Sequence, residues 1–502
     1  MVSEILQQRI HSLFEHCPTA DQQQAIETFC QFASDFETNS VMMLCGSAGT
    51  GKTTLASAIV KAMKSLGQKV VLLAPTGRAA KVFSVNSSTP AFTIHRKIYR
   101  QKAYTGLGGQ FQLADNMARN TLFLVDEASM IADCDTGIDS EYSFGSGSLL
   151  DDLIQFVYNG SCRMLLIGDR YQLPPVGFDE SPALSPETLS NYHLKVYQAE
   201  LDEVVRQASE SGILYNAQLI RQMISEGDVF DIPKLKFKGF SDIEILPGNE
   251  LIEQLDDSYY DMGVDETMVI TRSNKMAVRY NNGIRQMCRE CEDELEVDDM
   301  ITIVKNNYYW VEKEKGAKNA QTTNIKEGNT EISQKDDSGI PINFIANGDR
   351  ARVKKIRNEA EYYGFRFCDC TLEFPDYDNY EMTCTVLLST LQSESPSLTY
   401  EQQQHLYNEI MKEYEDIPHK ADRLTALKND PYYNALQIKY AYASTCHKAQ
   451  GGQWEHVYIE QGFLTEDMIN VEYYRWLYTA ITRAKDKLFL INWKRKHKTS
   501  ND

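Results

Sequence analysis

A glycine-rich run, Gly46-Ser47-Ala48-Gly49-Thr50-Gly51-Lys52-Thr53, follows a short apolar segment (residues 41–45) and precedes a helix-like one (54–66). Its spacing fits the phosphate-binding pattern G-x-x-x-x-G-K-T. Glycines let backbone N–H groups curl around phosphates at the start of a helix. Lys52 is placed to reach the β- and γ-phosphates, and the Thr53 hydroxyl to ligate Mg²⁺. We therefore predict a P-loop NTPase that uses ATP and Mg²⁺, with Gly46 to Thr53 and the following Thr54 holding the nucleotide.

A second segment with catalytic potential is the apolar run Leu122-Phe123-Leu124-Val125, which ends in Asp126 and Glu127. Acidic pairs at strand ends are common on ordinary surfaces. After a phosphate loop, however, this arrangement is the expected second half of the site. Asp126 would hold the magnesium shell and Glu127 would activate the attacking water.

Three more residues are candidates for γ-phosphate chemistry. Gln172 follows an apolar run at 164–167 and could orient the γ-phosphate or its water. Arg206 and Arg483 are candidate arginine fingers, which can raise phosphoryl-transfer rates by about 10³ to 10⁵. The chain has 51 Lys and Arg residues, so chemistry alone leaves both as possible surface arginines.

Short apolar runs ending at Gly, Pro or Asp surround these residues, at 41–45, 70–74, 121–125 and 164–167. Buried parallel strands have this pattern and carry function at their C-terminal ends. A second set lies at 266–271, 438–444, 457–460 and 487–491. The prediction is an α/β fold with two parallel-sheet domains.

Different material separates the two parts of the second set. Residues 312–339 are polar and predict a loop or hairpin insertion, 350–388 alternate as antiparallel strands do, and 400–428 predict a helical arm. The expected domains are 1–200, then 201–300 with 430–502, with 301–429 inserted as a β domain and its arm.

The chain has 502 residues and a net charge of −20, which is mild evidence against a nucleic-acid partner. A local basic groove can still bind phosphates, because the local field decides binding. No apolar run is long enough to cross a bilayer, and the N-terminus does not resemble a signal peptide. The eleven cysteines, an odd number, fit reduced thiols. Zinc at Cys288/Cys291 and Cys368/Cys370 is the less favoured alternative. We expect an intracellular, cytoplasmic protein of bacterial or phage type.

The ordered set of motifs, from Thr19-Ala20-Asp21-Gln22 to Thr479-Ala480-Ile481-Thr482-Arg483-Ala484, resembles the superfamily-one DNA helicases of the RecD, Dda and Pif type. The resemblance spans nearly the whole chain, and the layout looks most like the stand-alone Dda type. It implies two RecA-like domains, with an SH3-like β domain at 350–388 entered through Asn347-Gly348-Asp349. It also implies a monomer that moves 5′ to 3′ on single-stranded DNA and unwinds duplex at single-strand/double-strand junctions. DNA repair and DNA replication are among the pathways it leaves open.

The same resemblance implies roles for individual residues. Gln22 would read the adenine edge, and Gln450 with Gly451 would couple the strand to the nucleotide. Arg206 and Arg483 fall where the family places its γ-phosphate arginines. The implied strand contacts are Thr76, Thr93, His95, Asn274, Thr445, His447 and Lys448.

A duplex-splitting β-hairpin is implied at 97–116 (97–120 with its flanks), with Gly106-Leu107-Gly108-Gly109 as its turn and Phe111 as a candidate wedge. For Phe111, packing remains the favoured alternative. His95 and His447 could also be packed histidines. Tyrosine pairs such as Tyr473/Tyr474 could stack on bases, although packing is favoured.

Two features depart from the family. Gly452-Gln453-Trp454 stands where Ser-Glu-Phe is usual, which puts the ribose contact of an acidic residue in doubt. The insertion at 312–339 has no clear counterpart. Two other functions remain open: an ATP-gated clamp or remodeller that displaces proteins without unwinding, and an enzyme that moves on RNA.

Overall fold

The computed structural model describes residues 2–14, 17–37, 39–104, 109–133, 143–203, 211–323, 342 and 344–493. Within them, residues 274–443 form one compact unit and the remaining described residues form another. The domain boundaries predicted from the sequence remain predictions. No helix in the described part of the chain is long and apolar enough to cross a membrane.

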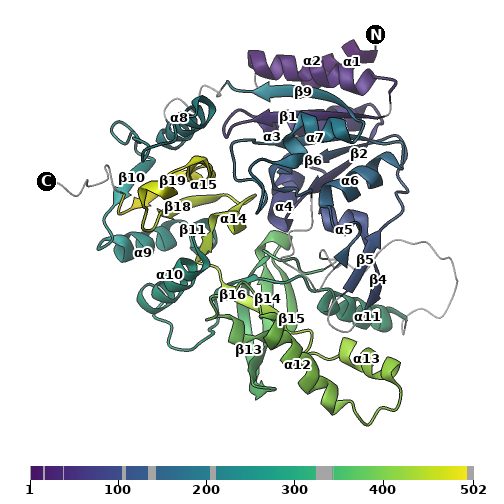
Figure 1. Ribbon diagram of the computed structural model, residues 1–502, viewed down its shortest axis with the longest axis vertical. Helices are drawn as coiled ribbons and strands as arrows, with labels where there is room; N and C mark the ends of the chain where they lie inside the picture. The colour runs from purple at the N-terminus through teal and green to yellow at the C-terminus, as the bar shows by residue number, and fades with distance from the viewer. Residues whose placement is uncertain are drawn as a thin grey trace. The chain divides into compact units, whose positions relative to one another are not determined.

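The first unit contains a six-stranded parallel sheet in the order β3-β2-β6-β8-β1-β9. Figure 1 labels four of these strands, β1, β2, β6 and β9. β1, β6 and most of β8 are buried on both faces, as their apolar sequences predict. The strands are β1 (Ser40–Gly46), β2 (Lys69–Ala74), β3 (Ala91–Thr93), β6 (Thr121–Val125), β8 (Arg163–Gly168) and β9 (Lys195–Leu201). The helices of this part are α1 (Val2–Ser12), α2 (Ala20–Ser34), α3 (Lys52–Ser65), α4 (Gly77–Ser87), α5 (Ile94–Ile98), α6 (Leu149–Tyr158) and α7 (Pro186–Asn191).

The predicted hairpin is present between α5 and β6. β4 (Tyr99–Tyr104) and β5 (Gly109–Leu113) pair antiparallel, and β7 (Ser143–Phe144) adds a third strand. Gly109 begins β5 rather than lying in a turn, while Gly106, Leu107 and Gly108 lie outside the described residues.

The same unit holds a second sheet in the order β10-β19-β18-β11-β17, whose first four strands run parallel. Its strands are β10 (Ile243–Leu246), β11 (Thr267–Thr271), β17 (Ala443–Thr445), β18 (Trp454–Glu460) and β19 (Ala484–Ile491). Its helices are α8 (Gly212–Glu226), α9 (Leu251–Asp261), α14 (Cys446–Ala449) and α15 (Val471–Ile481). Aromatic side chains of α15 fill the core of this part. The two parallel sheets confirm the predicted α/β, RecA-like fold class.

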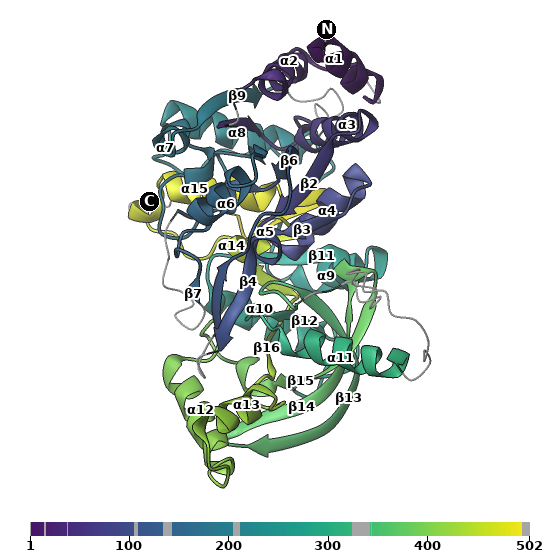
Figure 2. The ribbon, with the colours of Figure 1, turned by 90° about the vertical axis from the view of Figure 1, so that its right-hand side faces the viewer.

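The second compact unit is built on a closed five-stranded barrel (Figure 2). Its strands are β12 (Met300–Ile303), β13 (Arg350–Tyr362), β14 (Phe365–Phe374), β15 (Tyr380–Leu387) and β16 (Leu436–Tyr440). The pairs are antiparallel except β15 with β16. The helices are α10 (Asn274–Met287), α11 (Tyr309–Thr323), α12 (Tyr400–Glu413) and α13 (Lys420–Lys428). A small barrel is what the predicted SH3-like insertion requires.

Two sequence predictions are corrected here. The strand predicted at 438–444 is divided: its first residues close the barrel in β16, and the last belong to β17 of the second sheet. The polar insertion begins as helix α11 rather than as a loop. Tyr308 and Trp310 anchor its start, since Tyr308 stacks on Phe344 at 4.8 Å and the Trp310 indole donates to the Asn434 carbonyl at 2.8 Å. The residues of the insertion beyond 323 lie outside the described part.

Candidate functional site: a phosphate loop between two parallel sheets

The phosphate loop joins β1 to α3, and its glycines are used as the motif predicts. Gly49 and Gly51 have φ of +79° and +81°, a region that glycine adopts without strain. A Cβ on Gly46 would lie 2.8 Å from the Leu201 carbonyl oxygen of β9. The Lys52 ammonium donates to the carbonyls of Gly46 and Ser47 at 2.7 and 2.8 Å. The loop therefore curls tightly around its own lysine.

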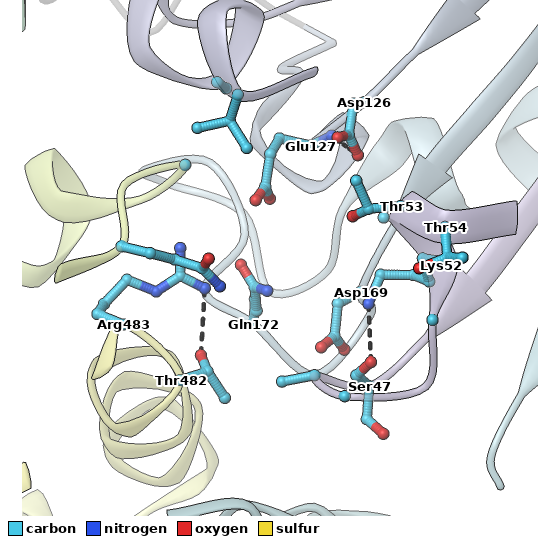
Figure 3. Close-up of a pocket in the computed structure, with 18 residues that line it drawn as sticks. Ser47, Lys52, Thr53, Thr54, Asp126, Glu127, Asp169, Gln172, Thr482 and Arg483 are labelled. Carbon is cyan, nitrogen blue, oxygen red and sulfur yellow. Dashed lines mark hydrogen bonds between the residues drawn. The ribbon is translucent and has the colours of Figure 1, made fainter. Parts of the chain in front are cut away.

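A cavity of about 290 Å³ opens at this loop, at the C-terminal ends of the strands (Figure 3). Of the residues predicted for nucleotide and metal binding, those lining it are Ser47, Ala48, Gly49, Gly51, Lys52, Thr53, Thr54, Asp126, Glu127, Gln172, Gly451 and Arg483. Gly46, Thr50, Gln22 and Gln450 lie behind this lining. Arg206 lies outside the described residues.

The two carboxylates leave the end of β6 in different environments. The Asp126 carboxylate accepts the Glu127 N–H at 2.9 Å. Burial, together with the neighbouring Glu127 charge, raises the pKa of Asp126 well above its usual range, while the Glu127 N–H and Lys52 act in the opposite direction. Glu127 has a left-handed backbone, with φ +52°. In Figure 3 its side chain points into the cavity between Lys52 and Arg483.

Two buried polar atoms at the cavity have no hydrogen-bond partner in the described part of the molecule: Ser47 Oγ and Gln172 Oε1. Their residues are only 4% and 6% exposed. Leaving a buried polar atom unpaired costs about 1–3 kcal/mol. The Ser47 hydroxyl can donate to an anionic ligand, whereas Gln172 Oε1 can only accept and suits a water molecule.

Arg483 enters the cavity just beyond the C-terminal end of α15, from the second sheet. It is 2% exposed, and its guanidinium donates to the carbonyls of Thr479 and Gly452 and to the Thr482 hydroxyl at 3.0 to 3.2 Å. These contacts fix the guanidinium, and Figure 3 shows it across the cavity from Lys52, with Gln172 between them. The structure thus brings elements of both sheets to one cavity.

The two glutamines behind the lining are held by backbone groups. Gln22 completes a capping box at the start of α2 with Thr19, and its amide also donates to the Thr50 carbonyl at 3.0 Å. Gln450 donates to the Leu173 carbonyl at 2.7 Å. Gln22 therefore supports the phosphate loop directly, a contact that sequence reasoning did not anticipate.

The segment that departs from the family is internally consistent. A Cβ on Gly452 would lie 2.5 Å from the Trp454 ring, so the tryptophan in this position requires glycine at 452. The Arg78 guanidinium lies 4.5 Å above that ring and donates to the Gln453 carbonyl at 2.6 Å. Gln453 lines the cavity. The position of the family's usual acidic residue is therefore occupied by the neutral Gln453, whose backbone carbonyl accepts a hydrogen bond from Arg78 of α4.

The predicted strand contacts lie mainly at helix starts. Thr76 and Thr93 cap α4 and α5, accepting the N–H groups of Ala79 and Arg96 at 3.2 and 3.3 Å. Thr445, His447 and Lys448 lie at α14, where burial lowers the pKa of His447. Asn274 begins α10 in the other compact unit.

Phe111 and His95 both pack against aromatic side chains. Phe111 is 7% exposed and stacks on Phe144 at 4.7 Å, at the base of the hairpin. His95 packs edge-on against Phe144 at 5.3 Å and lies 5.6 Å from Tyr99, and burial lowers its pKa to about 4. The burial of Phe111 favours packing, the alternative that the sequence also favoured, and its wedge role remains a prediction.

Sequence reasoning missed several polar groups at the cavity. Asp169 and Thr482 line it, and the fully buried Tyr478 and Thr479 stand behind it. The signal for Asp169 was available, since it follows the buried strand β8. Tyr478 and Thr479 lie within an apolar helix and carried no such signal.

Comparison with known proteins gives two family models in order along the chain. An AAA domain model matches residues 18–231, and the UvrD-like helicase C-terminal domain model matches residues 440–491. The uncharacterized protein MJ1519 of Methanocaldococcus jannaschii is 27% identical over 90% of this chain and 36% of its own length.

The ATP-dependent DNA helicase dda of Enterobacteria phage T4 is 30% identical over 51% of this chain and 55% of its own length. The chain thus spans about a third and about half of the lengths of these two relatives. A crystal structure of Pif1 helicase from Bacteroides with ADP-AlF3 and single-stranded DNA is 15% identical, with a TM-score of 0.45 over 95% of this chain and 93% of that one.

Proposed function

This chain belongs to the superfamily-one helicases of the RecD, Dda and Pif type, and on that premise we propose that it is an ATP-driven translocase that unwinds duplex DNA. The observation that carries the proposal is the composition of the cavity. Lys52, Glu127 and Gln172 come from the first sheet, and Arg483 comes from the second. A ligand that contacts both groups links the two sheets.

ATP fits this cavity by its chemistry. The N–H groups of the phosphate loop and the start of α3 favour phosphates. The unpaired Ser47 Oγ can donate to a phosphate oxygen, and the unpaired Gln172 Oε1 can accept from a water molecule. Thr53 and Asp126 are the oxygen ligands that would hold Mg²⁺, a cation that neutralises phosphate charge when bound. The raised pKa of Asp126 makes a nearby cation favourable, because positive charge stabilises its ionised form.

The chain's own residues then divide the reaction between them. Glu127 takes the proton of the attacking water, and Gln172 orients that water. Lys52 and Arg483 stabilise the charge that spreads over the transferred phosphoryl group. Because Arg483 belongs to the second sheet, hydrolysis and phosphate release change the contacts between the sheets.

Single-stranded DNA is the proposed track. The proposed contacts are drawn from both sheets of the first unit: Thr76 at the N-cap of α4, Thr93 at the end of β3, and Thr445, His447 and Lys448 at α14. Asn274 of the second unit is a further one. The 5′ to 3′ direction is proposed from the family alone, as are the monomeric state and the preference for junctions.

An unwinding assay on duplexes tailed only at the 5′ or only at the 3′ end tests activity and direction together. Unwinding should require the 5′ tail and ATP. Lys52→Ala should abolish it together with ATP hydrolysis, while Lys61→Ala on the exposed face of the same helix should keep both.

DNA-stimulated hydrolysis without unwinding on either substrate would replace the helicase with a clamp or remodeller. Equal stimulation of hydrolysis by DNA and RNA oligomers would reject the assignment to DNA.

A further inference from the structure

Helix α15 brings a second polar side chain to the phosphate loop besides Arg483. Tyr478 is completely buried, and its hydroxyl donates to Asp169 Oδ2 at 2.5 Å. The same hydroxyl oxygen accepts the Ala48 N–H at 3.3 Å. One hydroxyl therefore connects a helix of the second sheet, the phosphate loop and the carboxylate at the end of β8.

Thr479, the next residue of α15, contacts the loop that follows β8 and carries Gln172. Thr479 Oγ1 accepts the Leu173 N–H at 2.9 Å, and Gln450 donates to the Leu173 carbonyl at 2.7 Å. Gln172, whose Oε1 has no partner in the described part of the chain, lies between Asp169 and Leu173. The loop that carries Gln172 is thus fixed on both sides by residues of the second sheet.

The Ala48 N–H can donate either to the Tyr478 hydroxyl or to a phosphate oxygen. It lines the cavity within the phosphate loop, where such groups bind phosphate oxygens. Its bond to Tyr478 is long for an N–H···O contact, which is usually 2.9–3.0 Å, and its acceptor is neutral. A charged phosphate oxygen is a roughly twofold stronger acceptor, so it would take this N–H from the tyrosine. Binding of nucleotide then changes the hydrogen bonding of a side chain that belongs to the second sheet.

We propose that Tyr478 is a positioning residue that transmits the occupancy of the phosphate loop to the loop carrying Gln172 and to the second sheet. The proposal rests on the function proposed above, because it concerns the same nucleotide site. When phosphate takes the Ala48 N–H, the Tyr478 hydroxyl keeps Asp169 as its partner. The two sheets are then coupled through this side chain as well as through Arg483.

A purely structural role for the hydroxyl would have a different signature. Removing a buried hydrogen bond lowers stability and affects all activities alike. A transmitting role affects the response of the ATPase to DNA, because that response requires the second sheet to act on the phosphate loop. The stimulation factor, which is the ratio of kcat with and without single-stranded DNA, separates the two roles.

The chain provides a matched control on the same helix. Tyr474 is also completely buried, and its hydroxyl donates to the Asp231 carbonyl, away from the cavity. Tyr478→Phe and Tyr474→Phe each remove one buried hydroxyl from α15. Both variants are compared with wild type for thermal midpoint, ATP dissociation constant, the stimulation factor and nucleotides translocated per ATP hydrolysed.

We expect Tyr478→Phe to bind ATP within about threefold of wild type, because phosphate takes the Ala48 N–H in both proteins and displaces only a weak bond in the wild type. Its stimulation factor should fall at least tenfold, and it should advance less per ATP. Tyr474→Phe should keep both values. A wild-type stimulation factor in Tyr478→Phe overturns the proposal. So does an equal fall of kcat with and without DNA in the two variants.

Thr479→Val keeps the shape of the side chain and removes the acceptor for Leu173, and it serves if Tyr478→Phe does not fold. Loss of stimulation in Thr479→Val supports the proposal, and an unchanged factor overturns it. A wild-type protein without DNA-stimulated ATPase would reject the proposed function and this inference together. A stimulated wild type with a normal Tyr478→Phe rejects the inference alone.

Discussion

Glu127 is held in a conformation that side-chain-bearing residues seldom adopt. Its φ of +52° costs about 1–2 kcal/mol relative to ordinary backbone. Such a cost is tolerated where the surrounding structure needs the side chain in one place. Here the strained backbone directs the carboxylate into the cavity, which is where a general base must lie.

We predict that Glu127→Gln keeps ATP binding and slows hydrolysis by about 10² to 10⁴, the usual contribution of a general base. Single-turnover hydrolysis and equilibrium binding of a fluorescent ATP analogue measure the two effects separately. Hydrolysis within threefold of wild type would remove Glu127 from this role. A parallel loss of binding would instead indicate a damaged loop.

His95 makes a pH-dependent contribution to stability. Its pKa is lowered to about 4 because burial against Tyr99 and Phe144 disfavours the charged ring. In the unfolded chain its pKa is about 6.5. Between these values the unfolded state binds more protons, so stability is full above pH 6.5 and falls as the pH drops towards 4.

The difference in stability between wild type and His95→Phe should therefore change by about 1–2 kcal/mol between pH 7.5 and pH 5, in favour of the variant at pH 5. Urea-unfolding midpoints at the two pH values, for both proteins, measure it. An identical pH response in the two proteins would show that the ring is solvated.

For individual residues, the sequence predicted which side chains form the site better than it predicted what surrounds them. The spacing of Lys52, Thr53, Asp126 and Glu127 was enough to predict the cavity they line. For Phe111 both a wedge role and packing were considered, because a hairpin aromatic can face solvent or core; packing was favoured, and the pairing of β5 with β7 places Phe144 against the ring. Tyr478 was missed because a tyrosine within an apolar helix is usually a packing residue.

The base of the β4–β5 hairpin is braced by a buried carboxylate. Asp152 of α6 is 2% exposed and accepts the Tyr99 hydroxyl at 2.7 Å and the Ser146 N–H at 3.1 Å. Gly145, with φ +45°, lies directly over it: a Cβ there would be 2.0 Å from Asp152 Oδ2. The turn after β7 and the hairpin strand β4 therefore share one anchor.

Gly145→Ala should displace this anchor and reduce unwinding by at least fivefold, while leaving DNA-stimulated ATP hydrolysis within twofold of wild type. Both activities are measured on the same preparation. Gly177→Ala is the control, because Gly177 also has a positive φ (+88°) but no atom within 4 Å of the added Cβ. If both variants behave alike, backbone strain rather than the lost brace is responsible.

The predicted secondary structure was wrong where the local sequence pattern does not reveal which distant residues a segment pairs with or packs against. The run 438–444 has the apolar character of one strand, but its two ends pair in different sheets, as β16 and β17. Residues 309–323 have weak helical periodicity, and tertiary contacts of Tyr308 and Trp310 fix the start of α11. In both cases the deciding interactions come from residues distant in the sequence.

The whole chain carries a net charge of −20, and the proposed strand contacts are mostly neutral. The threonines and Asn274 have no charge, and burial lowers the pKa of His447. Lys448 is the remaining cation among the proposed contacts. DNA affinity should then depend on hydrogen bonds more than on the release of counterions from phosphates.

Each cation–phosphate contact adds about −0.7 to the slope of log K against log salt for single strands. We therefore predict a slope between about −0.5 and −2 for binding of single-stranded DNA near pH 7.5, measured by fluorescence anisotropy. Lys448→Ala should make it shallower by about 0.7, and Thr445→Val should weaken binding without changing it. A slope steeper than about −3 would mean that basic residues outside the proposed set hold the strand against the acidic body of the protein.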